Sequence, residues 1–438
     1  MPTSVQTINL RVESLGLPAV AGEEDTVARL TALPLSEATF ALASACARHL
    51  GGTEEFNRVI DHFKVPAGHL PAGFRVEWEL AGDGVLRADL VRDIAWDTDG
   101  RLRPTPVLLS ADTANPYELE PIAPLIANLT CNPGIIYDLF INNPKANLDH
   151  RFSTRDEVMA EIGRILGSGC DISVELNNPF DPDFAKILDE AQKFSDMLGR
   201  WRAVIKVPHT GPVNAANVGQ LLDGSKQLDR RWFAPATADS LAGHRLALKL
   251  REHGFRVNFT LMFEPHQALL ALQARPAYIN SFVRHRLLQS TNLAALLAEY
   301  RESGDEDVLV RLRDYLIKTD YLSSADSGFG LRDALQMAEE TLALRRFDGE
   351  GDDGLDDVRH NLRVLRTANL PQTRLIICSM EGATMYPAVE RLLAEPEFAD
   401  MGDRVVITAE PAYLARFASA NQVVSYQRRF MTAARGQS

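Results

Sequence analysis

Eight short apolar segments alternate with amphipathic stretches over residues 107–407 of this 438-residue chain. Short apolar segments separated by helical patterns predict parallel strands joined by helices. A count of eight favours a closed (β/α)8 barrel over an open doubly wound sheet. The predicted strands are residues 107–111, 125–130, 171–175, 203–207, 256–261, 277–280, 373–379 and 404–407.

The first hundred residues follow a different pattern. The predicted elements there are helices at 36–50 and 53–63 and a hairpin of strands at 74–80 and 85–90, turning at Gly82-Asp83-Gly84. Residues 101–106 contain two prolines and are interpreted as a linker. We therefore expect an N-terminal α+β extension over 1–104 and a barrel over 105–438.

The stretch between the sixth and seventh predicted strands is too long for one loop and one helix. It contains several helical patterns followed by a polar turn. We expect a helical insertion at about 285–370, on the face of the barrel where loops shape substrate choice, so that it forms a lid.

Composition excludes several classes of partner. The chain has 46 Lys and Arg against 59 Asp and Glu, a net charge of −13, which argues against a surface for nucleic acid or an anionic membrane. No apolar run reaches the roughly 18 residues of a membrane helix, and no secretory signal pattern is visible. The four cysteines lie far apart without a CxxC pair. These features predict a reduced, cytoplasmic protein.

Active residues of a (β/α)8 barrel lie at the C-terminal ends of its strands. The polar residues at the predicted strand ends are Asp112, Asn132, Glu175, Lys206, Asn258, Thr260, Asn280 and Ser379. The histidines show no metal-ligand spacing, and neither GxGxxG after the first strand, GxSxG nor GxxxxGK[ST] occurs. The sequence therefore indicates neither a metal nor an organic cofactor.

Lys206 is the single charge in the apolar segment Ala203-Val204-Ile205-Lys206-Val207-Pro208. Burial lowers the pKa of a lysine, and a neutral amine can attack a carbonyl to form a Schiff base. The alternative is a strand-end lysine whose ammonium group reaches water. Asp112 and Glu175 also have two interpretations each. They are either groups that transfer protons or residues that cap a helix.

Read in chain order, these segments resemble the transaldolase family of class I aldolases over about residues 105–420. The matching pieces include Ala111-Asp112-Thr113, Leu129-Thr130-Cys131-Asn132-Pro133, Val174-Glu175, the Lys206 segment, Val257-Asn258-Phe259-Thr260-Leu261-Met262-Phe263, Phe282-Val283, Ser379 and Ile407-Thr408.

The resemblance implies a mechanism without metal or organic cofactor. Lys206 forms an imine with a ketose carbonyl, and Asp112 is the acid/base that takes the hydroxyl proton as the C–C bond breaks. Glu175 and Thr260 hold a water. The implied substrate-binding residues are Asn132 and Asn258, supported by Thr130, together with Phe282, Ser379, Asn280, Glu381, Arg284 and Arg286. The substrate is a small sugar or sugar phosphate.

Two comparisons with the family bear on the substrate. The pair Glu175 and Phe282 resembles the transferase subgroup, because the related aldolases carry Gln and Tyr there. The two arginines that grip the substrate phosphate in the family are replaced by His285, between Arg284 and Arg286, and by Glu381. A carboxylate facing phosphate lowers affinity. We therefore expect a substrate without a phosphate at that place, carrying hydroxyls or an amine instead.

Other interpretations remain open at this stage. The chain could be an aldolase that makes or breaks a C–C bond without transfer, or a non-catalytic sugar-binding barrel. The N-terminal extension could cap the barrel mouth or form the contact of a homodimer.

Overall fold

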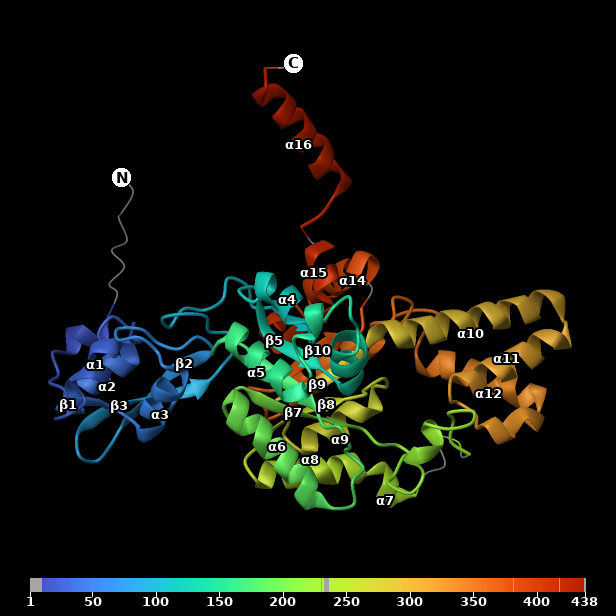
Figure 1. Cartoon of the computed structure of the whole chain (residues 1–438), viewed down its shortest axis with the longest axis horizontal. Helices are drawn as coiled ribbons and strands as arrows, with labels where there is room; N and C mark the ends of the chain where they lie inside the picture. The colour runs from blue at the N-terminus through green and yellow to red at the C-terminus, as the bar shows by residue number, and fades with distance from the viewer. Residues whose placement is uncertain (1–9, 230, 232–235, 381, 417, 437–438) are drawn as a thin grey trace. The chain divides into compact units, whose positions relative to one another are not determined.

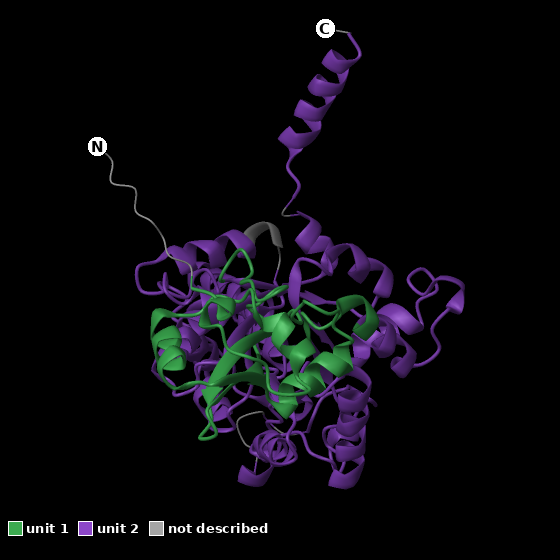
Figure 2. Ribbon diagram, turned by 90° about the vertical axis from the view of Figure 1, so that its left-hand side faces the viewer, with its two compact units in different colours: residues 1–106, 163–171 green, residues 107–162, 172–438 purple. Residues whose placement is uncertain are grey.

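The computed structural model describes residues 10–229, 231, 236–380, 382–416 and 418–436. Contacts divide the chain into two compact units, residues 1–106 with 163–171 and residues 107–162 with 172–438 (Figure 2). Of the described helices, none is both long enough and apolar enough to cross a membrane.

The second unit is built on a closed parallel barrel, which confirms the predicted (β/α)8 fold (Figure 1). The strands follow one another around the barrel in chain order, and β11 pairs with β4 to close it. Each predicted strand is present, with ends that differ by at most two residues. The strands are β4 (Leu108–Asp112), β5 (Ile126–Cys131), β6 (Asp171–Glu175), β7 (Ala203–Pro208), β8 (Arg256–Thr260), β9 (Tyr278–Phe282), β10 (Arg374–Cys378) and β11 (Val405–Ala409).

The barrel strands are buried on both faces, as parallel strands covered by helices must be. Every residue of β5, β7, β10 and β11 is buried. The helices that connect the strands or follow them are α4 (Pro116–Leu119), a π-helix (Gly134–Ile141), α5 (Arg155–Leu166), α6 (Phe184–Leu198), α7 (Thr237–Ser240), α8 (Ala242–Glu252), α9 (His266–Gln273), α14 (Gly382–Ala394), α15 (Pro411–Arg416) and α16 (Asn421–Ala434). Short 3₁₀ turns occupy Val12–Leu15, Glu120–Ile122, Leu148–His150, Val218–Leu221, Ser324–Gly328 and Gly402–Arg404.

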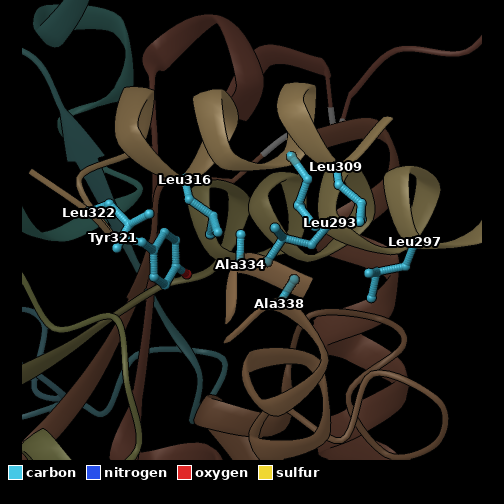
Figure 3. Packing of buried hydrophobic residues seen from close by; sticks show 9 residues of the cluster. Leu293, Leu297, Leu309, Leu316, Tyr321, Leu322, Ala334 and Ala338 are labelled. Carbon is cyan, nitrogen blue, oxygen red and sulfur yellow. The ribbon is translucent and has the colours of Figure 1, made fainter. Parts of the chain in front are cut away.

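The predicted helical insertion lies between β9 and β10. It consists of α10 (Val283–Ser303), α11 (Glu306–Lys318), α12 (Leu331–Leu344) and α13 (Asp356–Thr367). The first three helices pack around a hydrophobic core of their own, to which Leu293, Leu309 and Leu316 contribute fully buried side chains (Figure 3). This core keeps three long helices in place beside the barrel.

The first unit contains a three-stranded sheet in the order β1–β3–β2. Its elements are α1 (Glu24–Leu30), α2 (Glu37–Cys46), β1 (His49–Gly52), α3 (Glu54–Phe63), β2 (Phe74–Leu80) and β3 (Val85–Arg92). The α+β extension is confirmed, and β2 and β3 form the predicted antiparallel hairpin. Thr53 caps α3 by accepting a hydrogen bond from the Phe56 N–H at 3.0 Å.

One predicted helix is wrong in its last four residues. The helix expected over 36–50 ends at Cys46, and the chain continues as β1, parallel to β3. Two adjacent glycines explain the change. Glycine is a poor helix former, and a Cβ on Gly51 would lie 2.6 Å from Glu23 Oε2 while one on Gly52 would lie 2.7 Å from Thr26. The close approach to α1 therefore requires glycine at position 52, whereas a side chain at position 51 would displace the flexible end of Glu23.

Candidate active site

Lys206 points from the middle of β7 into the barrel, where its side chain is almost fully enclosed. The residue is only 5% exposed. The Lys206 Nζ lies 3.4 Å from Oε2 of Glu175, its direct neighbour in the register of β6 and β7. The lysine is therefore held in a dry site beside a carboxylate, as the Schiff-base interpretation requires, and does not reach bulk water.

The pKa of Lys206 is governed by two opposing influences. Burial is the larger single influence and lowers it, whereas the carboxylates of Glu175 and Asp112 raise it. Together the carboxylates prevail, so the pKa of Lys206 lies above its ordinary value. The expectation of a lowered pKa and a neutral amine is therefore wrong. The amine is protonated and must lose a proton before it attacks a carbonyl.

Asp112 ends β4 and sits opposite Thr130 in the register of β4 and β5. The Thr130 hydroxyl donates a hydrogen bond of 2.8 Å to Asp112 Oδ1. Burial raises the pKa of Asp112, against the influence of Lys206 and Thr130, which lower it. A carboxyl group that binds a proton more readily than usual suits a group that takes up and returns a proton during a reaction.

A cavity of about 120 Å³ opens above these residues at the C-terminal ends of the strands. Its lining carries two cations, Lys206 and Arg284, and two carboxylates, Asp112 and Glu410. Ser379 contributes from just past β10, where its backbone adopts a left-handed conformation with φ of 55°. This is the position at which barrel enzymes hold their substrates.

A chain of hydrogen-bonded polar side chains runs around the inside of the barrel. It passes through Thr408, Ser110, Asn128, Ser173, Asn258 and Asn280, which come from β11, β4, β5, β6, β8 and β9. Each of these residues is buried. Buried polar groups that are mutually satisfied hold one another in fixed positions. These hydrogen-bonded side chains therefore form a rigid polar layer inside the barrel. Two of them, Asn280 and Thr408, also line the cavity.

Residues 109–306 match the family model described as transaldolase/fructose-6-phosphate aldolase. Over this segment the chain is similar to that family. The match spans the strands β4 to β9, and with them Asp112, Glu175 and Lys206. Among curated proteins, no sequence matches the chain. The family and the closed barrel together support a class I aldolase-like enzyme.

The structure brings most of the residues implied by the family resemblance to one cavity. Those that line it are Asp112, Thr130, Asn132, Lys206, Asn280, Phe282, Arg284 and Ser379. Glu175 reaches the same place through its contact with Lys206. Asn132 directly follows β5, and its Oδ1 accepts a hydrogen bond of 2.9 Å from the Ile135 N–H at the start of the π-helix. The carboxyl ends of six strands and their loops therefore supply the site.

Two of the implied residues lie beneath the cavity surface. Asn258 is fully buried, donates to Ser173 Oγ at 3.2 Å and accepts from the Asn280 amide. Thr260 is also buried and does not line the cavity. Asn258 therefore acts on the site through Asn280, as a positioning residue, and not by direct contact with the cavity.

Arg286 is placed away from the cavity, where its guanidinium is fully used. It is 1% exposed and bonds the carboxylates of Asp356 and Glu264 and the carbonyl of Phe263. A guanidinium held by two carboxylates is not free to bind a substrate anion. Its part is structural, in joining α10 to α13. Glu381 lies outside the described residues.

Sequence reasoning missed several residues of the cavity. They are Cys378, Met380, Thr408, Ala409, Glu410 and Tyr413. The rule that polar residues at strand ends form the site would have found Thr408 and Glu410, because they end and follow the eighth strand. Burial raises the pKa of the Cys378 thiol, so this cysteine is a small protonated wall residue.

Proposed function

We propose that the enzyme forms a Schiff base between Lys206 and a ketose and transfers a dihydroxyacetone-type unit to an aldehyde acceptor. The observation that carries this proposal is the enclosed amine of Lys206, 3.4 Å from Glu175 and at the wall of a cavity shared with Asp112. Burial of a charge is unfavourable. A buried lysine beside carboxylates therefore indicates that its amine takes part in a reaction.

The proton movements follow from the two carboxylates. Lys206 releases its proton through Glu175, attacks the ketose carbonyl, and the carbinolamine loses water to give a protonated imine. Asp112 then takes the hydroxyl proton as the adjacent C–C bond breaks, and the bonding electron pair moves into the imine to give an enamine. When the enamine carbon attacks an aldehyde, Asp112 returns its proton to the new alkoxide. The raised pKa of Asp112 helps it keep that proton between the two steps.

We further propose that the substrate lacks a phosphate at the place where the family grips one. Among the described residues that line the cavity, Arg284 is the single guanidinium, and Glu410 places a carboxylate on the same wall. His285, at one of the positions where the family has an arginine, lies in α10 and is within hydrogen-bond distance of Gln289, with 3.1 Å between their Nε2 atoms. Balanced charges suit a neutral sugar better than a phosphate dianion.

Reductive trapping tests the Schiff base. The protein is incubated with dihydroxyacetone and borohydride, and the peptide that contains Lys206 is examined by mass spectrometry. We expect the reduced adduct on Lys206, and its loss in Lys206→Met. Lys186→Met, at an exposed lysine of α6, is the matched control and keeps the adduct. No adduct in the wild type, or an unchanged adduct in Lys206→Met, would overturn the proposal.

Acceptor dependence separates transfer from simple aldol cleavage, which the family description also covers. We expect release of the second product to require an aldehyde acceptor. Release of free dihydroxyacetone at the same rate without acceptor would identify an aldolase. Efficient turnover of fructose 6-phosphate with erythrose 4-phosphate would contradict the proposed absence of a substrate phosphate.

A further inference from the structure

A second cavity of about 210 Å³ lies between the insertion and the loop after β8. The barrel contributes Phe263 and Glu264 from that loop. The insertion contributes His285 and Gln289 from α10, residues 319–321 from the end of α11, and Arg345 after α12. The insertion therefore forms most of the wall, and its lining residues 319–321 and Arg345 lie beyond the segment that matches the family.

The back wall of this second cavity is a built network and not a gap left by loose packing. Arg345 is 2% exposed, joins Glu264 in an ion pair, and donates to the Tyr321 hydroxyl at 2.7 Å and to Gln289 Oε1 at 3.2 Å. Its Nε has no hydrogen-bond partner among the described residues. Figure 3 shows Tyr321 at the edge of the helical core that holds this wall. This wall is therefore held in a fixed arrangement by hydrogen bonds and an ion pair between buried groups.

The second cavity adjoins the first. Phe282 lines the cavity of Lys206, Phe263 lines the second cavity, and their rings lie 4.8 Å apart between centroids. The ring of His285, which also lines the second cavity, lies 5.5 Å from the ring of Phe263 between centroids. The two cavities therefore lie on either side of one aromatic pair, with one ring in the wall of each.

Polar groups interrupt a mostly apolar lining in this wall. Glu264 is already paired with Arg345 and Arg286, so Asp320 is the carboxylate of the wall that a phosphate would meet. Carboxylates, an amide and hydroxyls together offer both acceptors and donors, which is what sugar hydroxyls need, and the rings of Phe263 and Tyr321 offer apolar faces to C–H groups.

We propose that this second cavity is a subsite for the distal, polyhydroxylated and unphosphorylated end of the aldehyde acceptor. The role of this cavity as an acceptor subsite rests on the proposed transfer reaction. The binding of polyols to the cavity does not depend on that reaction. The insertion is then a specificity element that replaces recognition of a phosphate by recognition of hydroxyls.

Direct binding tests the subsite independently of catalysis. Saturation-transfer NMR is recorded with xylitol and sorbitol, which have no carbonyl and cannot form an imine. We expect a signal with the wild type and its loss in Thr319→Trp, which fills the cavity. Lys318→Trp places the same ring at the adjacent exposed residue and keeps the signal. Absence of polyol binding to the wild type, or equal binding to both Trp variants, would overturn the subsite.

Turnover tests the role of the subsite in acceptor choice. The quantity is the ratio of kcat/KM for a six-carbon to a three-carbon neutral aldehyde acceptor. We expect Thr319→Trp to lower this ratio at least about tenfold and Asp320→Asn to lower it about threefold or more, since one hydrogen bond to a ligand is worth roughly that much. Asp314→Asn, at another exposed carboxylate of the insertion, is the control for the second variant.

The possible failures can be told apart. If dihydroxyacetone is not trapped on Lys206 but xylitol binding is lost in Thr319→Trp, the proposed reaction fails and the polyol site stands. If trapping succeeds but the ratio is the same in Thr319→Trp and Lys318→Trp, the subsite proposal is wrong and the reaction stands. Should Thr319→Trp fail to fold, as judged by circular dichroism, Asp320→Asn decides the question because Asp320 is exposed.

Discussion

At the scale of single residues, the nucleophile and its carboxylates control one another. Lys206 carries a proton because Glu175 and Asp112 together outweigh the effect of burial on its pKa. Glu175 is the stronger of the two favourable influences, and its carboxylate is in direct contact with the amine. Removing the charge of Glu175 should therefore leave burial as the dominant influence and lower the pKa of Lys206.

The first prediction uses Glu175→Gln. The rate of dihydroxyacetone trapping on Lys206 is measured against pH, and its midpoint reports the pKa of the amine. We expect the midpoint to move to lower pH by about 1 unit or more, the usual effect of an opposite charge within 4–6 Å. Asp181→Asn, on the loop before α6, is the control. A midpoint that stays or rises would show that Glu175 does not set the protonation of Lys206.

A second prediction concerns Asp357, a buried carboxyl of α13. Burial raises the pKa of Asp357 to about 7, from its ordinary value of 3.8. Its Oδ1 has no hydrogen-bond partner among the described residues. Between these two pKa values the native protein holds a proton that the unfolded chain has released, so the free energy of unfolding falls as pH rises from about 4 to 7.

Asp357→Asn removes this dependence because asparagine keeps the shape without the charge. We expect the variant to gain stability over the wild type that is larger at pH 8 than at pH 5, with a difference on the order of 2–3 kcal/mol. Urea unfolding at the two pH values measures it, with Asp314→Asn as the exposed control. An equal change at both pH values would mean that Asp357 is ionised throughout.

The residues of the site differ in how far the sequence could predict them. Lys206 and Asp112 could be predicted as site residues because each is a charged residue in an otherwise mostly apolar strand. Arg286 could not be placed from the sequence, because its partners Glu264 and Asp356 are 22 and 70 residues away. Strand alternation puts Asn258 on the inner face, but only the packing shows that Asn280 covers it.

At the scale of secondary-structure elements, one carboxylate joins the insertion to the barrel. Glu264, in the loop after β8, forms ion pairs with Arg286 of α10 and with Arg345 at the end of α12. Both guanidiniums are buried, with 1% and 3% of the side chain exposed. Loss of Glu264 takes the carboxylate from the buried Arg345, while Arg286 keeps Asp356, and a buried charge that loses its partner is strongly destabilising.

We therefore predict that Glu264→Gln lowers the free energy of unfolding by about 3–5 kcal/mol. Hydrogen exchange should quicken most in α10 and α12, because these helices lose their tie to the barrel. The control is Glu299→Gln, which breaks an exposed pair with Arg311 and should change stability by less than about 1 kcal/mol. Equal effects of the two variants would show that the buried pairs contribute little.

The elements themselves could be predicted to different degrees. The barrel strands were found because apolar residues fill both faces, so each strand stands out against its polar surroundings. The helices of the insertion were expected, yet the second cavity that they line depends on the packing of three of them, α10, α11 and α12, and carries no sequence pattern. The strand β1 was missed because it is four residues long and continues directly from a helical pattern.

At the scale of the whole molecule, the order of the strands made the barrel predictable, whereas the way the chain is shared between the two units was not evident. The first unit takes residues 163–171 from the middle of the barrel sequence, so the chain enters it twice. Local patterns describe neighbours along the chain and carry no information on such a return. Each unit nevertheless has its own buried core, with Phe56 in the first and Phe194 in the second.

Two compact units with separate cores should unfold in separate transitions, because cooperativity depends on shared packing. In calorimetry of the full chain we expect Phe56→Ala to lower the midpoint of one transition and Phe194→Ala that of the other, each by truncating a buried aromatic side chain worth roughly 3–5 kcal/mol. Leu148→Ala, at an exposed position, is the control and should move neither transition. A single transition that both phenylalanine variants lower equally would show that the two units form one cooperative whole, and the N-terminal extension would then be an integral part of the enzyme's stability.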